Sequence, residues 1–126
     1  MHNNPKCYLK MKKIKTLSYK DDKIGKLIEK IIDIFKESIN IPFRVYIFGS
    51  FATGKATYFS DIDIALETKE TLNEKDIIKL RKKLNDIPTL RKIDFIYLNK
   101  ASTNIRETVK EEGVLIYEFG KQIDRI

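Results

Sequence analysis

Two aspartates, Asp61 and Asp63, stand one residue apart at the start of a segment in which apolar and polar residues alternate up to residue 67. Strict alternation predicts a half-buried β-strand. Side chains two positions apart on a strand project from the same face, about 6.5–7 Å from each other. Two carboxylates so placed repel each other unless a cation or a proton neutralises one of them. Oxygen ligands of this kind suit Mg²⁺, so the segment predicts a metal site.

A glycine and a serine, Gly49 and Ser50, follow a run of β-branched and aromatic residues and precede Asp61 by ten intervening residues. Glycine lets the backbone approach a ligand closely, and the first amides of a helical turn can bind a phosphate oxygen. The Ser50 hydroxyl can add one more donor. Taken alone, Gly-Ser can be an ordinary turn and Asp-x-Asp a solubility device of an edge strand. Together, at this spacing, they favour a site for a metal and a phosphate.

Residues 49–56 also fit most of the phosphate-binding P-loop, G-x-x-x-x-G-K-[ST]. The last position is Ala56, which has no hydroxyl to hold Mg²⁺ as the Ser or Thr of that motif does. A P-loop also leaves the two aspartates without a role, so we prefer the first interpretation. Lys55 is a candidate cation near a triphosphate, and a solvated turn lysine is the alternative.

The Gly-Ser pair, followed after ten residues by Asp-x-Asp, resembles the signature of the polymerase-beta-type nucleotidyltransferase superfamily. It is most similar to the short stand-alone members, the minimal nucleotidyltransferase (MNT) family. The resemblance runs over roughly residues 24–118 and includes the segment Lys92-Ile93-Asp94-Phe95. It implies an α/β (α+β) fold in which helices pack on one face of a small mixed β-sheet.

The resemblance also implies a nucleotidyltransferase that uses ATP as substrate and two Mg²⁺ ions as cofactors. Asp94 lies in an otherwise apolar segment, where an unpaired acid is costly to bury. In the family pattern it is a third carboxylate, which ligates the metal that activates the acceptor hydroxyl. A structural hydrogen bond or an exposed strand start is the alternative. The predicted catalytic and metal-binding residues are Asp61, Asp63 and Asp94, and the predicted phosphate-binding residues are Gly49, Ser50 and Lys55.

Short MNT proteins are commonly the antitoxins of HEPN-domain ribonucleases and attach AMP to a tyrosine of the toxin, so the resemblance implies such a partner and a complex with it. Many members have arginines in the loop after Gly-Ser, where this chain has Phe51 and Thr53. A non-catalytic antitoxin that masks a ribonuclease by binding therefore stays open. An enzyme that adenylylates a small molecule or an RNA end is a third interpretation, although the chain leaves little room for an acceptor domain.

The composition predicts one globular domain without disulfides. The 126 residues are 42% hydrophobic and 34% charged, which is typical of a folded cytoplasmic protein with room for one modest core. The single cysteine and single histidine exclude an internal disulfide and a zinc set, so a metal must be held by oxygen. No apolar run approaches the ~20 residues that cross a bilayer.

The basic character of the chain belongs to its first residues. The net charge is +7, yet residues 1–20 hold six lysines and no acid, and beyond them 19 basic residues face 18 acidic ones. We therefore predict a basic extension at residues 1–20 and a nucleotidyltransferase domain at residues 21–126. The extension is a solvated flank or an arm that contacts RNA or an acidic partner.

The first helix is predicted by apolar residues at helical spacing from 24 to 39, with Asp21 or Asp22 as its cap. It ends before Pro42. The predicted strands are residues 43–48, 61–67, 92–98 and 114–119.

Two further helices are predicted from their ends. A capping box, Thr71-x-x-Glu74, opens one that stops at the next proline. Ser102 or Thr103 begins the other, and Gly113 ends it as the residue after the cap.

Overall fold

Strands and helices alternate along residues 22–57 and 59–120, the part of the chain that the computed structural model describes. Within this part no helix is both long and apolar enough to cross a bilayer. The predicted extension at residues 1–20 lies outside the described residues. In chain order the elements are α2 (Asp22–Ser38), β1 (Phe43–Phe48), α3 (Ser50–Thr53), β2 (Ile62–Thr68), α4 (Glu74–Asn85), β3 (Ile93–Tyr97), the 3₁₀-helix η1 (Leu98–Lys100), α5 (Thr103–Glu112) and β4 (Val114–Phe119).

The four strands form one mixed sheet in the order β3-β2-β1-β4. β1 runs antiparallel to both β2 and β4, whereas β2 and β3 are parallel and are connected through α4. The mixed sheet predicted from the sequence is thereby confirmed. A P-loop strand belongs to a parallel sheet, so the antiparallel neighbours of β1 exclude that alternative for the Gly-Ser turn.

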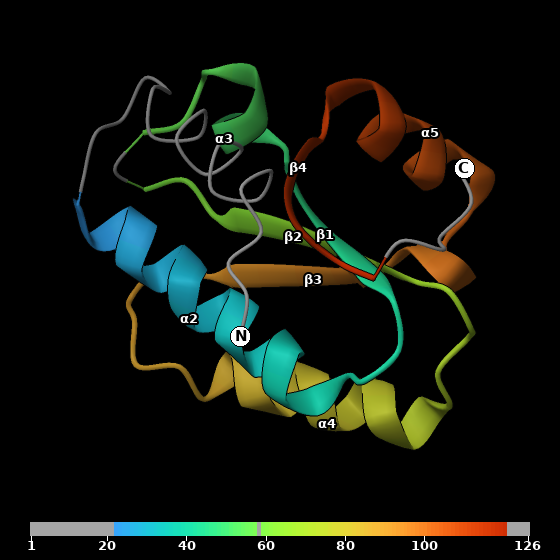
Figure 1. Ribbon diagram of the computed structural model, residues 1–126. Helices are drawn as coiled ribbons and strands as arrows, with labels where there is room; N and C mark the ends of the chain where they lie inside the picture. Colours follow the sequence, from blue (N-terminus) through green and yellow to red (C-terminus); the bar gives the residue numbers. More distant parts are fainter. Residues whose placement is uncertain (1–21, 58, 121–126) are drawn as a thin grey trace.

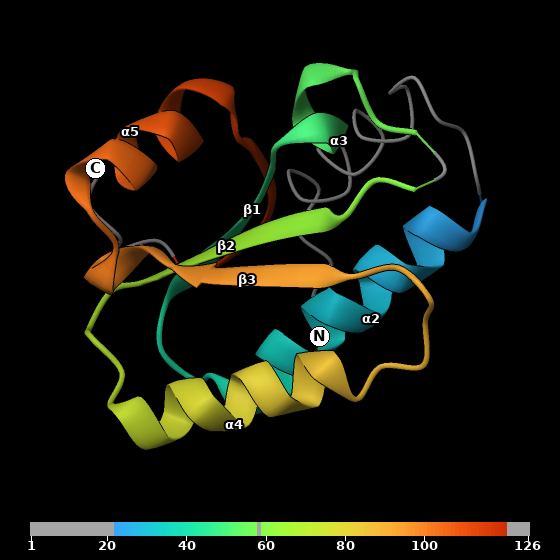
Figure 2. The same ribbon diagram turned by 180° about the vertical axis from the view of Figure 1, so that it is seen from behind.

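The two faces of the sheet are covered unequally. In Figure 1 and, from behind, in Figure 2, α2 and α4 lie on one face and α5 on the other. α3 follows the end of β1 and buries its Phe51 in the same cluster as the side chains of α2. The first face holds the main core, where the buried side chains of α2, such as Phe35, meet Val45 and Ile64 of the sheet. α5 covers part of the second face, and its Val109 packs with Ala65 and Leu98 in a smaller cluster. The predicted helical layer on one face is present, and α5 adds the second cover.

The capping box predicted at Thr71 is wrong, because α4 begins later. Its N-cap is Asn73, whose side chain accepts a hydrogen bond of 2.9 Å from the amide of Asp76. Asparagine is at least as good an N-cap as threonine, so the helix starts at Glu74 and not two residues earlier, at Leu72. For α5 the predicted cap Ser102 is confirmed, since its hydroxyl accepts from the amide of Ile105.

Gly113 ends α5 as predicted, but it is the C-cap itself and not the residue after the cap. Its φ of −72° is not left-handed, so it is not the glycine of a left-handed helix end. A Cβ built on this residue would overlap the carbonyl oxygen of Val109, so glycine is required by close packing as the chain turns into β4. The predicted caps of α2 are not tested, because Asp21 and the side chain of Asp22 lie outside the described residues.

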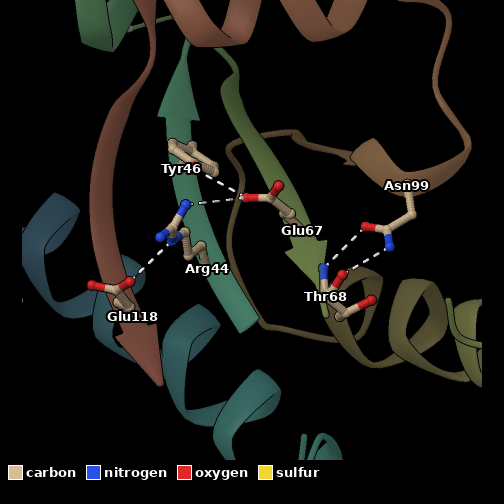
Figure 3. A network of polar contacts seen from close by, with 6 residues as sticks. All are labelled: Arg44, Tyr46, Glu67, Thr68, Asn99 and Glu118. Carbon is tan, nitrogen blue, oxygen red and sulfur yellow. Dashed lines mark hydrogen bonds and ion pairs between the residues drawn. The ribbon is translucent and has the colours of Figure 1, made fainter. Parts of the chain in front are cut away.

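A polar cluster joins three strands at the end of β1 farthest from Gly49 (Figure 3). Arg44 of β1 lies between two acids, with 3.0 Å from its Nε to Glu118 of β4 and 3.8 Å from its Nη1 to Glu67 of β2. The hydroxyl of Tyr46 donates to Glu67 over 3.2 Å. Burial, and then the negative charge of Glu67, raise the pKa of Tyr46 to about 12, so it stays a neutral donor. These contacts reinforce the order β2-β1-β4.

Candidate functional site

Asp63 and Asp94 lie side by side on the parallel strands β2 and β3. They are direct partners in the register of that pair. Their neighbours Ile62 and Phe95 are buried in the main core, so both carboxylates belong to the face opposite α2 and α4. The structure thus brings together two acids that are 31 positions apart in the sequence.

The Asp63 carboxyl is held in an unfavourable electrostatic environment. Its pKa is raised from 3.8 to about 6, first by burial and then by the charge of Asp94, a hydrogen bond with Asp94 and the charge of Asp61. Lys92 acts in the opposite direction. Any cation or proton that neutralises part of this negative charge stabilises the pair.

The Gly-Ser turn is packed directly against Asp63. Gly49 has φ of 74° and ψ of −147°, a backbone conformation that L side chains rarely adopt. A Cβ built on it would overlap Oδ2 of Asp63, so only glycine permits this approach. The amides of Ala52 and Thr53 donate to the Gly49 carbonyl over 3.0 and 3.1 Å, which forms the short helix α3. The amides at the start of such a turn have no acceptor within it and are suited to an anion.

Asp61 lies one residue before β2, which begins at Ile62. Asp61 is close enough to raise the pKa of Asp63 but lines a different pocket, beside α2. Within residues 22–57 and 59–120, no three acidic, histidine or cysteine side chains form a ready-made metal cluster. Lys55 is exposed in the turn after α3.

A cleft of about 440 Å³ is lined by Asp63 and Asp94. Its walls include Arg81 and Asn85 of α4, which local sequence patterns do not connect with the aspartates. Lys92, also in the wall, places its Nζ 3.6 Å from Oδ1 of Asp94. Of these wall residues, only Lys92 could be connected with Asp94 from the sequence, because it stands two positions before it and residues two apart in extended chain share a face.

Arg91 connects the loop before Asp61 with the Gly-Ser turn. Its Nη1 donates to the carbonyls of Ser60 over 2.6 Å and Thr57 over 3.4 Å. Its guanidinium lies 5.4 Å from the ring centroid of Phe51 in α3. Phe51 is only 1% exposed, so it is a core residue, and the arginine typical of the family at this loop is replaced by a packing side chain. No sequence pattern predicts Arg91, because its partners are 31 or more positions away.

Comparison with known proteins identifies relatives with this arrangement. Residues 29–122 match the family "Polymerase beta, Nucleotidyltransferase". A protein of Haemophilus influenzae named "Probable protein adenylyltransferase MntA" is 29% identical over 97 residues, which cover 75% of this chain and 83% of that protein.

Solved structures give the same result. A toxin–antitoxin complex with AMP-PNP contains a chain that is 31% identical, with a TM-score of 0.61, 75% of this chain covered and 73% of that chain. A complex of tri-AMPylated Shewanella oneidensis HEPN toxin with its MNT antitoxin contains one that is 27% identical, with a TM-score of 0.58, 72% of this chain covered and 69% of that chain. The family predicted from the Gly-Ser and Asp-x-Asp motif is confirmed. The match spans well over half of the chain, which therefore belongs to the polymerase beta nucleotidyltransferase family.

Proposed function

We propose that the chain is a Mg²⁺-dependent protein adenylyltransferase. It transfers AMP from ATP to a hydroxyl of a protein partner and acts as the antitoxin of a HEPN-type toxin. The observation that carries the proposal is the Asp63–Asp94 pair packed against the Gly49-Ser50 turn. It is supported by relatives described as a protein adenylyltransferase, as a toxin–antitoxin complex with AMP-PNP, and as an antitoxin beside an AMPylated toxin.

The donor set fits Mg²⁺. Asp63 and Asp94 present adjacent carboxylates, and after burial the charges of Asp94 and Asp61 raise the pKa of Asp63 against the opposite effect of Lys92. We assign Asp61, Asp63 and Asp94 as the residues that would hold the ion. Bound there, Mg²⁺ supplies stabilisation for the charge that develops on the attacking and leaving oxygens.

The chain's own groups orient the nucleotide and accept the proton. The first amides of α3 and the Ser50 hydroxyl hold the β- and γ-phosphates, and Lys55 approaches the triphosphate from solvent. The acceptor oxygen forms a bond to the α-phosphorus while the bond from that phosphorus to the bridging oxygen of the β-phosphate breaks. Pyrophosphate leaves with the electron pair, and the hydroxyl proton passes to the Asp94 carboxylate. A cytoplasmic location follows from the use of ATP.

The test is the intact mass of the partner. The chain is incubated with its co-encoded HEPN-type neighbour, ATP and Mg²⁺, and the neighbour is weighed. AMP-sized additions are expected with the wild type and with Asp33→Asn, an exposed carboxylate of α2 that serves as the control. Additions should be absent with Asp63→Asn, with Asp94→Asn and with excess EDTA. Wild-type-like turnover by Asp63→Asn would refute the assignment.

A non-catalytic antitoxin remains the second candidate, because Phe51 occupies the loop position of the family's arginine and is buried. A neighbour that is inhibited in complex yet unmodified would select this candidate. A small-molecule or RNA acceptor would instead appear in a screen with labelled ATP in which the neighbour stays unlabelled.

A further inference from the structure

A second pocket, of about 780 Å³, opens next to the first turns of α2. Figure 1 shows this end of α2 beside the loops that precede β2 and β3. The pocket is lined by side chains from α2, from residues 59–61 and from residues 88–92, and Asp61 is one of them. It therefore borders the proposed active site at the end of the sheet next to α2.

The charge of this pocket differs from that of the rest of the body. Asp61 is the one acid among its described lining residues. Residues 21–126 as a whole carry 19 basic and 18 acidic side chains, so the positive charge is concentrated here and not spread evenly. A concave surface of one sign attracts groups of the opposite sign. The basic lining residues are Lys23, Lys26, Lys30, Arg91 and Lys92.

Three of these lysines form a row on one helix face. Lys23, Lys26 and Lys30 are spaced by three and four positions, and like charges at this spacing destabilise a helix. In residues 22–57 and 59–120, neither Lys26 nor Lys30 takes part in an ion pair. An acidic group from another molecule would relieve the repulsion in this row.

The rim of the pocket is apolar as well as basic. Leu90 and Phe59 are the two most exposed large hydrophobic side chains in the described part of the chain, at 106% and 87%. Ile24 and Leu27 also line the pocket. Apolar tips within a charged rim are typical of protein interfaces and offer nothing to a bare triphosphate. Arg91 fixes the loop that carries Phe59 through the Thr57 and Ser60 carbonyls.

We propose that this pocket docks an acidic segment of the protein that receives AMP, with apolar side chains of that segment against Leu90 and Phe59. The lysine row orients the segment, and the hydroxyl residue next to it reaches the carboxylates past Asp61. This inference rests on the proposed function and adds to it the chemical class of the acceptor segment.

The first test measures binding without ATP, so that it does not depend on catalysis. The probe is a fluorescent random copolymer of glutamate and tyrosine, and the readout is anisotropy. Lys26→Glu/Lys30→Glu should weaken binding by at least about 10-fold, because two attractions become repulsions. The matched control is Lys75→Glu/Lys79→Glu, exposed lysines of α4 with the same spacing that do not line the pocket, and it should bind like the wild type.

Leu90→Ser tests the apolar part without a change of charge. It should weaken copolymer binding several-fold and leave the melting temperature unchanged, because the side chain is fully exposed. If the α2 double variant and the α4 control variant lost copolymer binding equally, the proposal would be overturned, since net charge alone would then explain binding. Displacement of the copolymer by ATP would overturn it in favour of a nucleotide pocket. Tighter binding of an RNA oligomer, lost in the same variants, would overturn it in favour of a nucleic-acid site.

The second test separates this inference from the proposed function. In the transfer assay, Lys26→Glu/Lys30→Glu should raise the KM for the partner and leave the KM for ATP unchanged. Unchanged KM values with active transfer would refute the docking site alone. A wild-type protein that never transfers AMP would refute the proposed function, and with it the acceptor role of the pocket, while the copolymer data would still report whether an acidic segment binds.

Discussion

At the scale of single residues, Asp63 combines a cost in stability with a role in binding. Its carboxyl lies between Gly49 and Asp94, where burial and repulsion raise its pKa to about 6. A group whose pKa is higher in the folded than in the unfolded chain stabilises the fold only while it is protonated. Without a cation, the ionised Asp63 therefore lowers the free energy of unfolding at neutral pH.

Asp63→Asn is expected to stabilise the metal-free protein at pH 7 while it removes AMP transfer. In the wild type, the free energy of unfolding should fall as pH rises from about 4 to about 6, and the variant should lack this part of the pH dependence. The gain at pH 7 should reach no more than about 1 kcal/mol, because the carboxyl is partly open to solvent, which screens the penalty.

Urea unfolding at pH 5 and pH 7 in EDTA measures this effect. Asp33→Asn should keep the wild-type pH profile, since this residue is exposed on α2. A destabilised Asp63→Asn at pH 7 would contradict the electrostatic explanation.

Gly49→Ala is expected to impair both stability and transfer, because the new methyl group meets Oδ2 of Asp63 and the positive φ adds strain. We expect a loss of about 1–3 kcal/mol in the free energy of unfolding and little remaining activity. Gly54→Ala is the matched control: it also has a positive φ, of 79°, but nothing lies within 4 Å of its added Cβ. It should show the backbone strain alone, so equal effects of the two variants on transfer would contradict the role of close approach.

At the scale of elements, local patterns predict the strands well and the start of α4 less well. The bounds of β1 and β4 agree with the prediction, because alternation and flanking turn residues fix them. The predicted start of α4 is wrong because two cap residues compete within three positions, and Asn73 makes the cap hydrogen bond with the amide of Asp76. Only the family resemblance predicts that Asp63 and Asp94 lie together, because no local sequence pattern specifies the register of two parallel strands.

The position of Arg91 could not be predicted at all, because its contacts are formed only when the loops before β2 and β3 meet. Arg91→Met should reduce AMP transfer by about 10-fold or more and the free energy of unfolding by about 1–2 kcal/mol, since the Ser60 and Thr57 carbonyls lose a charged donor. Arg91→Lys should be intermediate, because an ammonium keeps the charge without the planar fork. Steady-state transfer kinetics and urea unfolding measure both effects. Full activity of the methionine variant would show that the loop keeps Asp61 in place without this contact.

At the scale of the whole molecule, the two faces of the sheet differ in how firmly their helices are held. α2 buries six apolar side chains, whereas α5 buries only Val109. Helices with few buried contacts open at lower free energy than the rest of a protein. Native-state hydrogen exchange should therefore show weaker protection in residues 104–112 than in residues 26–38. Equal protection of the two segments would indicate that the smaller cluster is as cooperative as the main core.

The alignment of Asp63 with Asp94 has a consequence for errors in folding. A shift of one residue in the register of β2 and β3 would place the Asp94 side chain in the main hydrophobic core and the Phe95 side chain in the cleft. A misaligned chain would then lose its packing and its chemistry in the same step. A chain with this shift is therefore not a stable but inactive form of the protein, because the same register is needed for folding and for the proposed reaction.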